Sequence, residues 1–415
     1  MQILISGASV AGPALAYWLN RYGFDVTVVE RAPSLRKTGG HAIDLFRPAM
    51  DIVEKMGLID PITAKKTGTN WLTMYSEGQY REGQYREGQE GAVELDLRRV
   101  FTAVSDRHVE IMRDDLSEIF YDATRADVEY VFDDSITAIA EDGTVTFERG
   151  AARRFDLVVG ADGLHSNVRG LVFGPESGFS TWIGAYLAVF SVPNYLDLDG
   201  RMEGLSGIGR MAGMYGAAHM SDARAVFLFR TPEQLQYHHR DVARQKELLR
   251  ERFAGMGWQV PRLLAELDRT PAFYFDSITQ LRLDTWSRGR VTLVGDAGYC
   301  PGPAVGGSTS LAVVGAYILA GELAAARGDH ERAFPAYEAE IGEYVRRSRT
   351  FAVGAAKRIV PGNRFDLWTL TQAARLIGHL PVAVTKAATK LGSKGMRLHD
   401  SIALKDYSAY EGVRQ

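Results

Sequence analysis

The residues best suited to chemistry sit in short glycine-containing segments, and the first of them is Gly7-Ala-Ser-Val-Ala-Gly12. It follows an apolar run and opens a stretch with helical periodicity. Glycines at such a turn let the phosphates of a dinucleotide approach the N–H groups at a helix start. Ser9 replaces the middle glycine of the usual pattern, which adds a hydroxyl donor and reduces the clearance. An ordinary strand-to-helix turn is the alternative. We expect the phosphate contacts at Gly7, Ser9, Val10, Ala11 and Gly12.

An acidic residue, Glu30, ends the second apolar run of the chain. A carboxylate at the end of the second strand of a dinucleotide-binding unit accepts hydrogen bonds from ribose hydroxyls and repels the 2′-phosphate of NADP. The position therefore suits the adenosine ribose of FAD or NAD, with Arg31 beside it. A surface ion pair between Glu30 and Arg31 is the alternative interpretation.

Two later segments place an aspartate beside a glycine at the end of an apolar run. In the first, 156–169, the pair Asp162-Gly163 forms a turn before a short helix that contains Arg169. The second, 295–310, begins with Gly295-Asp296 and continues into a glycine-rich helix start. An aspartate at a strand end can bind ribityl or ribose hydroxyls, and the N–H groups of a helix start stabilise negative charge. The residues expected at that helix start are Gly306, Gly307, Ser308 and Thr309.

The first thirty residues predict the elements that position the first two motifs. Ile3–Ser6 is a short apolar run, typical of a buried parallel strand. Ala11–Tyr22 has the periodicity of a helix that ends at Gly23, where a left-handed residue is expected. Asp25–Glu30 is a second strand. Strand, glycine turn, helix and strand in this order form a βαβ unit.

The rest of the chain predicts a nucleotide-binding fold interrupted by a second sheet. Alternating segments between 175 and 275 indicate antiparallel strands, and an apolar strand at 290–295 returns to the first fold. The fold class is therefore α/β: a Rossmann-like FAD- or NAD-binding fold with an inserted, mostly antiparallel β-sheet domain and a C-terminal helical tail. Helices are expected over 48–56, 113–124 and 311–326, and strands over 128–147 and 155–160. The expected domains are 1–174, with 70–100 contributing to the inserted sheet, 175–278, 279–360 and 361–415.

Composition excludes several classes of function. The 415 residues carry 48 basic and 51 acidic side chains, a net charge of −3, so we expect no nucleic-acid-binding face. Cys300 is the only cysteine, which excludes an intrachain disulfide and a four-cysteine zinc site, and we expect no metal. Met1-Gln2 leaves no room for a secretory signal, and the apolar run Leu311–Ala326 is too short to cross a bilayer and contains Glu322. We expect a cytoplasmic protein without a membrane span.

The ordered motifs resemble those of the class A flavoprotein monooxygenases, which share the para-hydroxybenzoate hydroxylase fold. They are the GxSxxG turn, the strand-end glutamate, Asp162-Gly163 and Gly295-Asp296, with the expected β domain between the last two. Within this family the chain is similar to enzymes that act on polycyclic aromatic and polyketide compounds, including tetracycline-inactivating monooxygenases. The resemblance covers Ile3 to Leu323.

The resemblance assigns roles to the residues that match the motifs of the family. It implies noncovalent FAD as the cofactor. It places Gly7, Ser9 and Gly12 at the FAD pyrophosphate, Glu30 at the adenosine ribose and Arg113 at the ribose or phosphates. Arg47 and Pro301 are placed at the isoalloxazine face, and Asp296 at the ribityl or pyrophosphate end. Asp162 is placed near the flavin and nicotinamide, in a pair with Arg169.

The resemblance also implies a reaction. FAD reduced by NADH or NADPH reacts with O₂ to a C4a-hydroperoxide, and a ring carbon of an aromatic or polycyclic substrate attacks its distal oxygen. Because the flavin performs the oxygen chemistry, the protein orients the substrate and excludes water. No protein base is assigned. A Baeyer–Villiger or dehydrogenase-type flavoenzyme and a noncatalytic FAD-binding module stay open, as do a monomer and a homodimer.

Two segments depart from the usual form of the family. The motif GDAAH is here Gly295-Asp-Ala-Gly-Tyr299, and GxGxN is Gly306-Gly-Ser-Thr-Ser310. Ser308 stands in place of a glycine and leaves less space in the loop that holds the flavin. Ser310 stands in place of an asparagine, so the side-chain amide of that asparagine is lost. We expect FAD binding to survive both changes, while the position and mobility of the flavin stay open.

Several other features have two interpretations. The glycines of 207–213 imitate a second dinucleotide turn, but no βαβ unit surrounds them, so we expect turns of the β domain. Cys300 is either reactive or, as we favour, small core filler. The repeat within 77–91 is assigned no function. The C-terminal tail, 361–415, is expected to pack across both domains, and a dimer contact or a membrane-surface helix is the alternative. A methionine and aromatic set lines the substrate pocket or belongs to the sheet core: Met211, Met214, Tyr215, Phe227 and Phe229.

Overall fold

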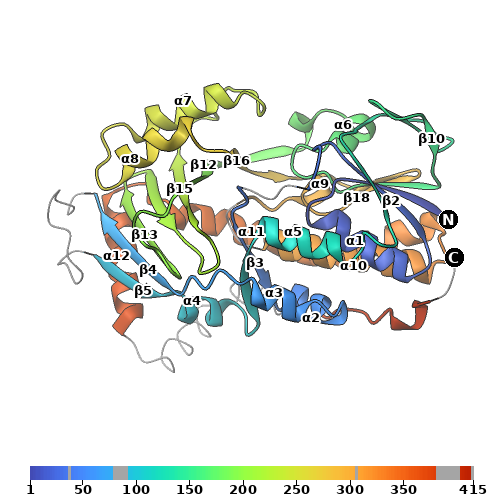
Figure 1. The fold of residues 1–415 in the computed structure, drawn as a ribbon, viewed down its shortest axis with the longest axis horizontal. Helices are drawn as coiled ribbons and strands as arrows, with labels where there is room; N and C mark the ends of the chain where they lie inside the picture. The colour runs from blue at the N-terminus through green and yellow to red at the C-terminus, as the bar shows by residue number, and fades with distance from the viewer. Residues whose placement is uncertain (36–38, 78–91, 304–306, 380–401, 413–415) are drawn as a thin grey trace.

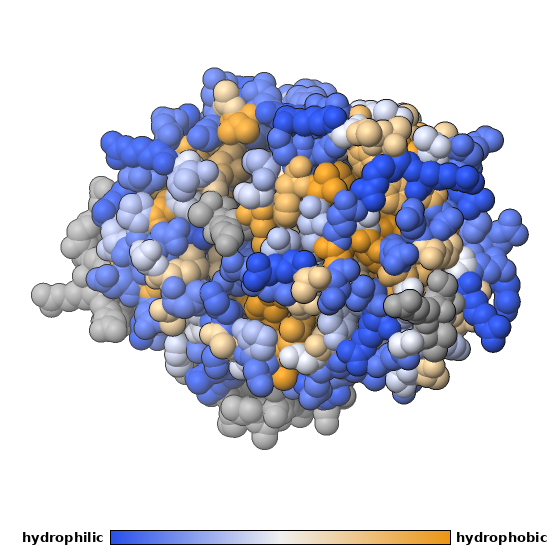
Figure 2. Space-filling model, turned by 45° about the vertical axis from the view of Figure 1, so that its right-hand side comes forward, coloured by the Kyte–Doolittle hydropathy of each residue, from blue (hydrophilic) through white to orange (hydrophobic). Residues whose placement is uncertain are grey.

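The computed structural model describes residues 1–415 except 36–38, 78–91, 304–306, 380–401 and 413–415. Figure 1 shows two parts side by side, one holding the N-terminus and a parallel sheet, the other built on a second sheet. The face drawn in Figure 2 is largely hydrophilic at its edge, with hydrophobic side chains gathered towards its middle. The repeat 77–91 lies almost wholly outside the described residues.

A sheet of six strands in the order β17-β18-β11-β1-β2-β7 forms the centre of the first part. Its strands are parallel except for the edge strand β17. Valine, isoleucine and leucine dominate its central strands and are buried, as expected for a parallel sheet covered on both faces. The strands are β1 (Gln2–Ser6), β2 (Asp25–Glu30), β7 (Glu129–Phe132), β11 (Leu157–Gly160), β17 (Ser287–Arg288) and β18 (Val291–Leu293).

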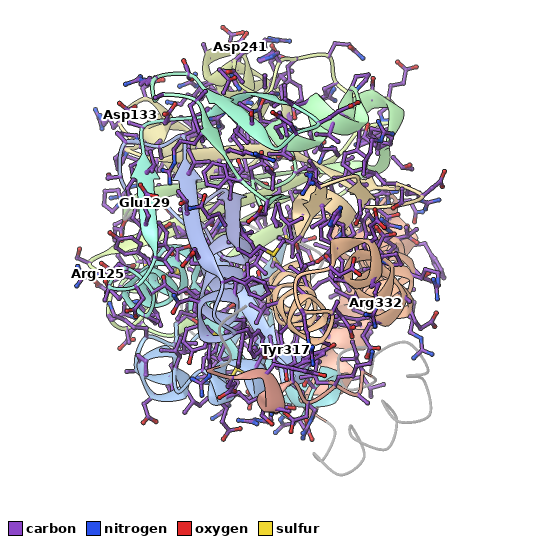
Figure 3. All side chains as sticks on the ribbon, turned by 90° about the vertical axis from the view of Figure 1, so that its right-hand side faces the viewer. Arg125, Glu129, Asp133, Asp241, Tyr317 and Arg332 are labelled. Atoms are coloured by element: carbon purple, nitrogen blue, oxygen red, sulfur yellow. The ribbon has the colours of Figure 1, made fainter. Side chains whose placement is uncertain are left out.

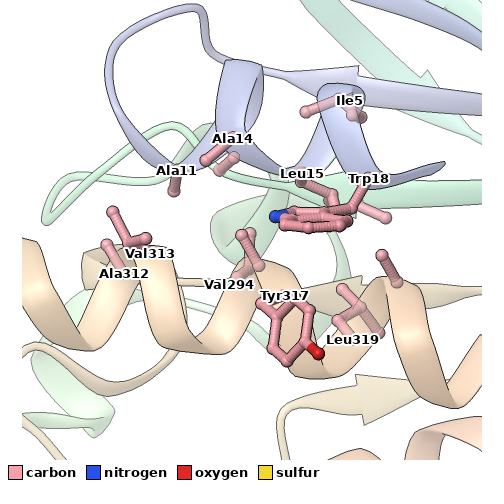
Figure 4. Close-up of a cluster of buried hydrophobic side chains, with 14 of the residues drawn as sticks. Ile5, Ala11, Ala14, Leu15, Trp18, Val294, Ala312, Val313, Tyr317 and Leu319 are labelled. Carbon is pink, nitrogen blue, oxygen red and sulfur yellow. The ribbon is translucent and has the colours of Figure 1, made fainter. Parts of the chain in front are cut away.

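Helices α1 (Ala11–Arg21) and α10 (Ser308–Ala325) pack against each other although they are far apart in the sequence (Figure 4). Small side chains allow the close approach, and Trp18 meets Tyr317 edge-on with ring centroids 4.9 Å apart. Among the described residues, α10 is the one helix long and apolar enough to cross a membrane, but 83% of it is buried inside the protein. It is therefore placed as a core helix.

The second part is built on seven strands in the order β16-β12-β15-β14-β13-β4-β5, antiparallel except for the pair β4 and β13. Helices α7 (Val242–Phe253) and α8 (Val260–Ala265) pack on its outer face. The segment 71–96, far earlier in the chain, supplies β4 and β5. The strands are β4 (Trp71–Ser76), β5 (Val93–Asp96), β12 (Ser180–Pro193), β13 (Arg201–Gly207), β14 (Arg210–Tyr215), β15 (Asp222–Arg230) and β16 (Phe273–Leu281).

Strands β3 (Ala42–Phe46) and β6 (His108–Met112) form a two-stranded sheet between the two larger ones. One face contributes Ile43 and Ile111 to the core of the first part, and the other contributes Ala42 and Met112 to the inner face of the second. A three-stranded sheet lies at the surface, made of β8 (Ile136–Ile139), β9 (Thr144–Phe147) and β10 (Arg153–Arg154). The remaining short helices are α2 (Arg47–Lys55), α3 (Ile59–Ala64), α4 (Leu97–Val104), α5 (Arg113–Asp122), α6 (Asn167–Phe173), α9 (Asp296–Tyr299), η1 (Glu176–Gly178) and η2 (Glu266–Asp268).

The C-terminal segment contacts both parts. Helix α11 (His330–Ile359) packs against α10 and β12, and α12 (Arg364–His379) packs against β5. Residues 402–412, with η4 (Ser408–Tyr410), return to the first part, where the hydroxyl of Tyr317 donates to the carbonyl oxygen of Lys405 at 2.9 Å (Figure 3).

The structure confirms the predicted fold class, with its parallel sheet, its inserted antiparallel sheet and its helical tail. Gly23 has a φ of +84° after α1, as a left-handed helix end requires. The glycines of 207–213 lie in the hairpin between β13 and β14, with Gly209 at φ +71° in its turn. They therefore belong to a hairpin of the second sheet, with Gly207 and Gly213 in its strands, and not to a dinucleotide site.

Candidate functional site

The glycine turn after β1 has no room for side chains at two positions. Gly7 has a φ of +108°, and a Cβ there would lie 2.6 Å from the carbonyl oxygen of Ala161. A Cβ at Gly12 would lie 1.9 Å from the carbonyl oxygen of Gly7. The turn leads through the buried Val10 and Ala11 into α1. The N–H groups and dipole of that helix start favour a phosphate.

Glu30 lies at the end of β2 beside this turn. Its Oε2 accepts a hydrogen bond from the N–H of Ala8 at 2.9 Å, and its Oε1 accepts one from the N–H of Ala32 at 2.8 Å. Both bonds hold the half-buried carboxylate at the edge of the glycine turn. Arg31 is exposed, and the described residues show no ion pair between it and Glu30, which disfavours the surface-pair interpretation.

Arg113 reaches the glycine turn from α5. Its Nε donates to the hydroxyl of Ser9 at 3.1 Å, and that hydroxyl lies 3.5 Å from the hydroxyl of Ser117. The serine that replaces a glycine therefore has partners on α5, and a cation stands at the start of α1. Burial and the charge of Arg113 lower the pKa of the neighbouring His41 to about 3, so this imidazole is neutral.

Asp162 lies where β11 ends and caps α6. Its carboxylate accepts hydrogen bonds from the N–H groups of Asn167 at 2.8 Å and Val168 at 3.1 Å, and from the hydroxyl of Ser166. Burial raises the pKa of Asp162 despite these bonds. Gly163 follows with a φ of +83°, which turns the chain away from the strand.

The predicted pair of Asp162 with Arg169 is wrong. Arg169 is 1% exposed, and its Nη2 forms an ion pair with Glu176 at 2.6 Å. Its Nη1 donates to the carbonyl oxygen of Ala297 at 2.8 Å. The reason is local, because the start of α6 already occupies the oxygens of Asp162. Arg169 instead ties the Asp162-Gly163 segment to the Gly295-Asp296 segment.

Asp296 begins α9 after Gly295, whose φ is +68°. The hydroxyl of Ser308 donates to Oδ1 of Asp296, so this departure from the family pattern fixes the carboxylate. Gly307 caps α10 in the left-handed conformation, with a φ of +89°. Thr309 is half-buried in the first turn of α10, and Gly306 lies outside the described residues.

Ser310, which stands where the family has an asparagine, ties α10 to β3. Its fully buried hydroxyl accepts from the N–H of Phe46 at 2.9 Å and donates to the carbonyl oxygen of Asp44 at 3.3 Å. Arg47 follows directly as the first residue of α2, and its guanidinium forms an ion pair with Asp106. Pro301 is buried, and its carbonyl oxygen accepts from Nε2 of Gln280 at 2.9 Å. No pattern in the sequence indicated the role of Ser310.

The other departures lie in the core. Tyr299 is fully buried, and the hydroxyl of Tyr337 on α11 donates to its hydroxyl at 2.9 Å. Gly315 on α10 leaves room for that hydroxyl. Cys300 is also fully buried, and burial raises the pKa of its thiol well above the usual value. A thiol in this state is a poor nucleophile, which supports the core interpretation of Cys300.

The predicted pocket residues divide between the two faces of the second sheet. Residues of one strand alternate between faces, so the five cannot line one wall. This corrects the pocket prediction for the three residues buried beneath α7 and α8. Those three are Met214, Phe227 and Phe229, whereas Met211 and Tyr215 lie on the inner face, which packs against Met112 of β6 and Ala352 of α11.

A network of ionisable groups between the two parts had no signal in the sequence. Nε2 of His165 lies 3.1 Å from Asp276 of β16, and its Nδ1 lies 3.1 Å from Glu176. Burial alone would lower the pKa of His165, but the two carboxylates outweigh it and raise the pKa to about 9. The exposed His239 stacks on His165 with ring centroids 4.3 Å apart.

Residues 1–351 match the FAD binding domain family. A flavin-dependent monooxygenase of Legionella longbeachae serogroup 1 (strain NSW150) is 38% identical over 85% of this chain and 88% of its own. The chain belongs to the class A flavoprotein monooxygenases. The present chain is also 47% identical to an uncharacterized protein of Mycobacterium tuberculosis (strain CDC 1551 / Oshkosh), over 84% of this chain and 91% of that protein. The crystal structure of tetracycline destructase Tet(55) aligns with a TM-score of 0.79 and 35% identity, over 98% of each chain.

The residues of this monooxygenase fit FAD. The glycine turn would be filled by any Cβ, and the start of α1 beside it carries the Ser9–Arg113 contact. Glu30 is held by a hydrogen bond at the turn before α1, and Asp296, the first residue of α9, is held by Ser308 at the start of α10. Among the described residues no group of three or more histidine, cysteine, aspartate or glutamate side chains could hold a metal ion.

Proposed function

We propose that this monooxygenase uses NADH or NADPH and O₂ to hydroxylate an aromatic or polycyclic small molecule. FAD, when bound, supplies the redox and oxygen chemistry. The chain holds the cofactor, orients the substrate and excludes water from the reaction. A cytoplasmic location and a monomeric or homodimeric state stay predictions from the sequence.

The observation that carries this proposal is the place of β3. At one end of the strand, Ser310 bonds it to the start of α10. At the other end, the N–H of Ala42 donates to the hydroxyl of Tyr215 at 2.9 Å, on the inner face of the second sheet. One short strand therefore connects a helix start that favours negative charge with an apolar wall.

The protein's own groups have separate tasks in this arrangement. The glycine turn, Ser9 and Arg113 are proposed to bind the FAD pyrophosphate, and Glu30 its adenosine ribose. The start of α10 at Gly307 is proposed to stabilise negative charge on the reduced flavin ring. Arg47 and Pro301 are proposed to lie at the flavin face; Arg47 begins α2 directly after the strand that Ser310 holds.

The inner face of the second sheet favours a large apolar substrate. Leucine, valine, isoleucine and methionine side chains dominate it. Burial of flat apolar surface against such a wall is a strong and non-directional driving force. The solved relative named a tetracycline destructase supports a polycyclic substrate for this chain as well.

The cofactor is tested by purification. The protein is expected to carry yellow, noncovalent FAD and to oxidise NADPH faster when an accepted substrate is present. In the variant Arg113→Met we expect at least tenfold weaker FAD binding, measured by fluorescence titration of the apoprotein. Arg125→Met is the control, since Arg125 pairs with Asp122 at the surface of the same segment. A colourless protein that cannot be reconstituted with FAD would exclude the proposal.

The reaction class is tested by the products. Hydroxylation adds one atom of ¹⁸O from labelled O₂ to an aromatic ring and leaves the ring size unchanged. Ring expansion to an ester would indicate a Baeyer–Villiger oxygenase, and a product without label a dehydrogenase. The hydrogen bonds of Ser308 and Ser310 stabilise the described end of the altered loop, residues 307–310, and argue against a noncatalytic module.

A further inference from the structure

Helix α11 carries a half-buried arginine, Arg349, whose guanidinium is largely unpartnered. Nε and Nη2 of Arg349 are both buried and have no hydrogen-bond partner among the described residues. None of the described carboxylates forms an ion pair with it. Burial and the nearby charge of Arg282 lower the pKa of Arg349 only to about 10, so it stays charged at neutral pH. An uncompensated buried charge is strongly unfavourable unless a ligand pairs with it.

A second arginine is fixed beside the first. Nη2 of Arg282 donates to Oε1 of Gln280 at 3.1 Å. Nε2 of this fully buried glutamine donates to the carbonyl oxygens of Pro301 at 2.9 Å and Arg349 at 2.7 Å. Gln280 therefore connects the guanidinium of Arg282 and the backbone of Arg349 to the loop after α9. That loop carries Pro301, a residue proposed to lie at the flavin face.

Neither guanidinium has an ion pair with a carboxylate in the described part of the chain. Such a pair matches a ligand with several anionic oxygens, because each group offers a planar fork of donors. We propose that Arg349 and Arg282 form an oxyanion site beside the flavin face. Its ligand is either the diphosphate of the nicotinamide co-substrate or an acidic oxygen of the aromatic substrate. The inference rests on the proposed use of NAD(P)H and an aromatic substrate.

The diphosphate has one further observation in its favour. The only other glycine pattern typical of a dinucleotide turn, 207–213, is a hairpin of the second sheet. The described residues thus contain a single dinucleotide-binding unit, which the FAD pyrophosphate uses. The diphosphate of a nicotinamide cofactor must then bind to cations outside that unit. The arginine pair is suited to this, because Gln280, which bonds Arg282, also bonds the carbonyl oxygen of Pro301 in the loop after α9.

The first experiment measures binding without turnover. With FAD in excess, inorganic pyrophosphate is expected to raise the melting temperature of the native enzyme. Arg349→Met is expected to melt at a higher temperature than the native enzyme, because it removes an uncompensated charge, and to lose the response to pyrophosphate. The control Arg347→Met removes an exposed arginine of the same helix, paired with Glu343 at 2.7 Å, and should keep the response. No response in the native enzyme, or an equal one in Arg349→Met, overturns the site.

The second experiment identifies the ligand. If the diphosphate binds there, Arg349→Met should raise the NADPH concentration for half-maximal anaerobic flavin reduction at least tenfold, with FAD content unchanged. If the substrate binds there, the substrate should change the flavin spectrum less in the variant than in the native enzyme. The NADPH concentration for half-maximal flavin reduction should then be the same in both proteins. Arg349→Lys, which keeps the charge, should restore part of the affinity in either case. If neither ligand is affected, the site is excluded. Because the melting experiment needs no substrate, failure of the proposed hydroxylation would not be mistaken for failure of the oxyanion site.

Discussion

Tyr299 shows how one departure from a family motif is matched by residues elsewhere. Its hydroxyl receives a hydrogen bond from Tyr337 and occupies the space above Gly315 of α10. A Cβ at Gly315 would lie 1.9 Å from that hydroxyl. Glycine inside a helix normally lowers stability relative to alanine. At this position the tyrosine requires it.

Replacing a glycine inside a helix by alanine usually stabilises a protein, but the variant Gly315→Ala is expected to destabilise this one. The overlap with Tyr299 should lower the free energy of unfolding by roughly 1–3 kcal/mol, the range for overpacked cores. Urea unfolding of the FAD-free protein measures it. Tyr299→Phe removes the overlapping atom, so the two changes should be non-additive in a double-mutant cycle.

Gly354 of α11 is the matched control. A Cβ there meets no atom within 4 Å. Gly354→Ala should stabilise the protein by up to about 1 kcal/mol, from helix propensity alone. Equal effects of the two alanine variants would show that Tyr299 does not occupy the space beside Gly315.

His165 gives the stability of the protein a defined dependence on pH. Its pKa is about 9 in the folded chain, against an ordinary value near 6.5, because Asp276 and Glu176 hold the protonated form. A raised folded-state pKa adds stability that is complete below about pH 6.5 and is lost as the pH rises through 9. The contribution is at most about 3 kcal/mol.

The variant His165→Asn should remove this dependence. Unfolding by urea at pH 6 and pH 9.5 should show a smaller difference for the variant than for the native protein. His219→Asn, which loses a half-exposed pair with Asp115, is the control and should keep the native slope. A native protein equally stable at both pH values would contradict the assignment.

How far the sequence predicts these residues depends on how local their signals are. Gly7, Gly12 and Glu30 were predicted because their spacing within one βαβ unit fixes their geometry. The roles of Ser310 and Arg349 were missed because the groups beside them, Phe46 and Arg282, lie far away in the chain and nothing in the neighbouring residues indicates them. The pair of Asp162 with Arg169 was wrong for the opposite reason, since a nearby helix start took the carboxylate.

At the level of elements, strands of the parallel sheet and helices α1, α5 and α10 match their predicted ranges to within a few residues. Strong apolar periodicity and glycine ends explain this agreement. The place of β3 between the two sheets was not predicted, nor was the pairing of β4 with β13. Pairings of strands distant in sequence depend on tertiary contacts, which a local pattern does not carry.

The segment 402–412, which returns to the first part, packs against helix α10 and forms hydrogen bonds with it. The ring of Tyr407 packs on Gly321 of α10, and its hydroxyl donates to the buried carboxylate of Glu322 at 2.7 Å. Lys405 also bonds Glu322, at 2.9 Å. An acidic side chain in an otherwise apolar core helix is thus satisfied from the end of the chain.

The variant Tyr407→Phe is expected to lower the free energy of unfolding by roughly 1–3 kcal/mol, because a buried carboxylate loses a hydrogen bond. Because α10 also begins at the proposed flavin site, the native protein and the variant should be compared with and without FAD. Tyr410→Phe, in the same segment, is the control, since among the described residues Tyr410 forms no hydrogen bond with Glu322. Equal stability of the two variants would show that the contact with Glu322 contributes nothing.

At the scale of the whole molecule, we propose that the two faces of the second sheet have different tasks, one in stability and the other in substrate binding. Its outer face is core beneath α7 and α8, while its inner face meets β6 and α11. Two methionines of β14 lie on opposite faces, since their positions differ by an odd number of residues. Met214 is fully buried on the outer face, and Met211 is 8% exposed on the inner one. They have the same side chain and the same strand, so they compare the two faces directly.

We expect Met214→Ala to lower the free energy of unfolding by roughly 2–5 kcal/mol, the range for a large core side chain, with an unchanged KM for the substrate. Met211→Ala should cost less stability, because Met211 keeps a little exposure where Met214 has none, and should change that KM at least tenfold if the inner face binds the substrate as proposed. Urea unfolding and substrate-dependent NADPH oxidation measure both quantities. If Met214→Ala changed the KM and Met211→Ala did not, the substrate would have to bind on the α7 side, and β3 would lose the connecting role on which the proposed function depends.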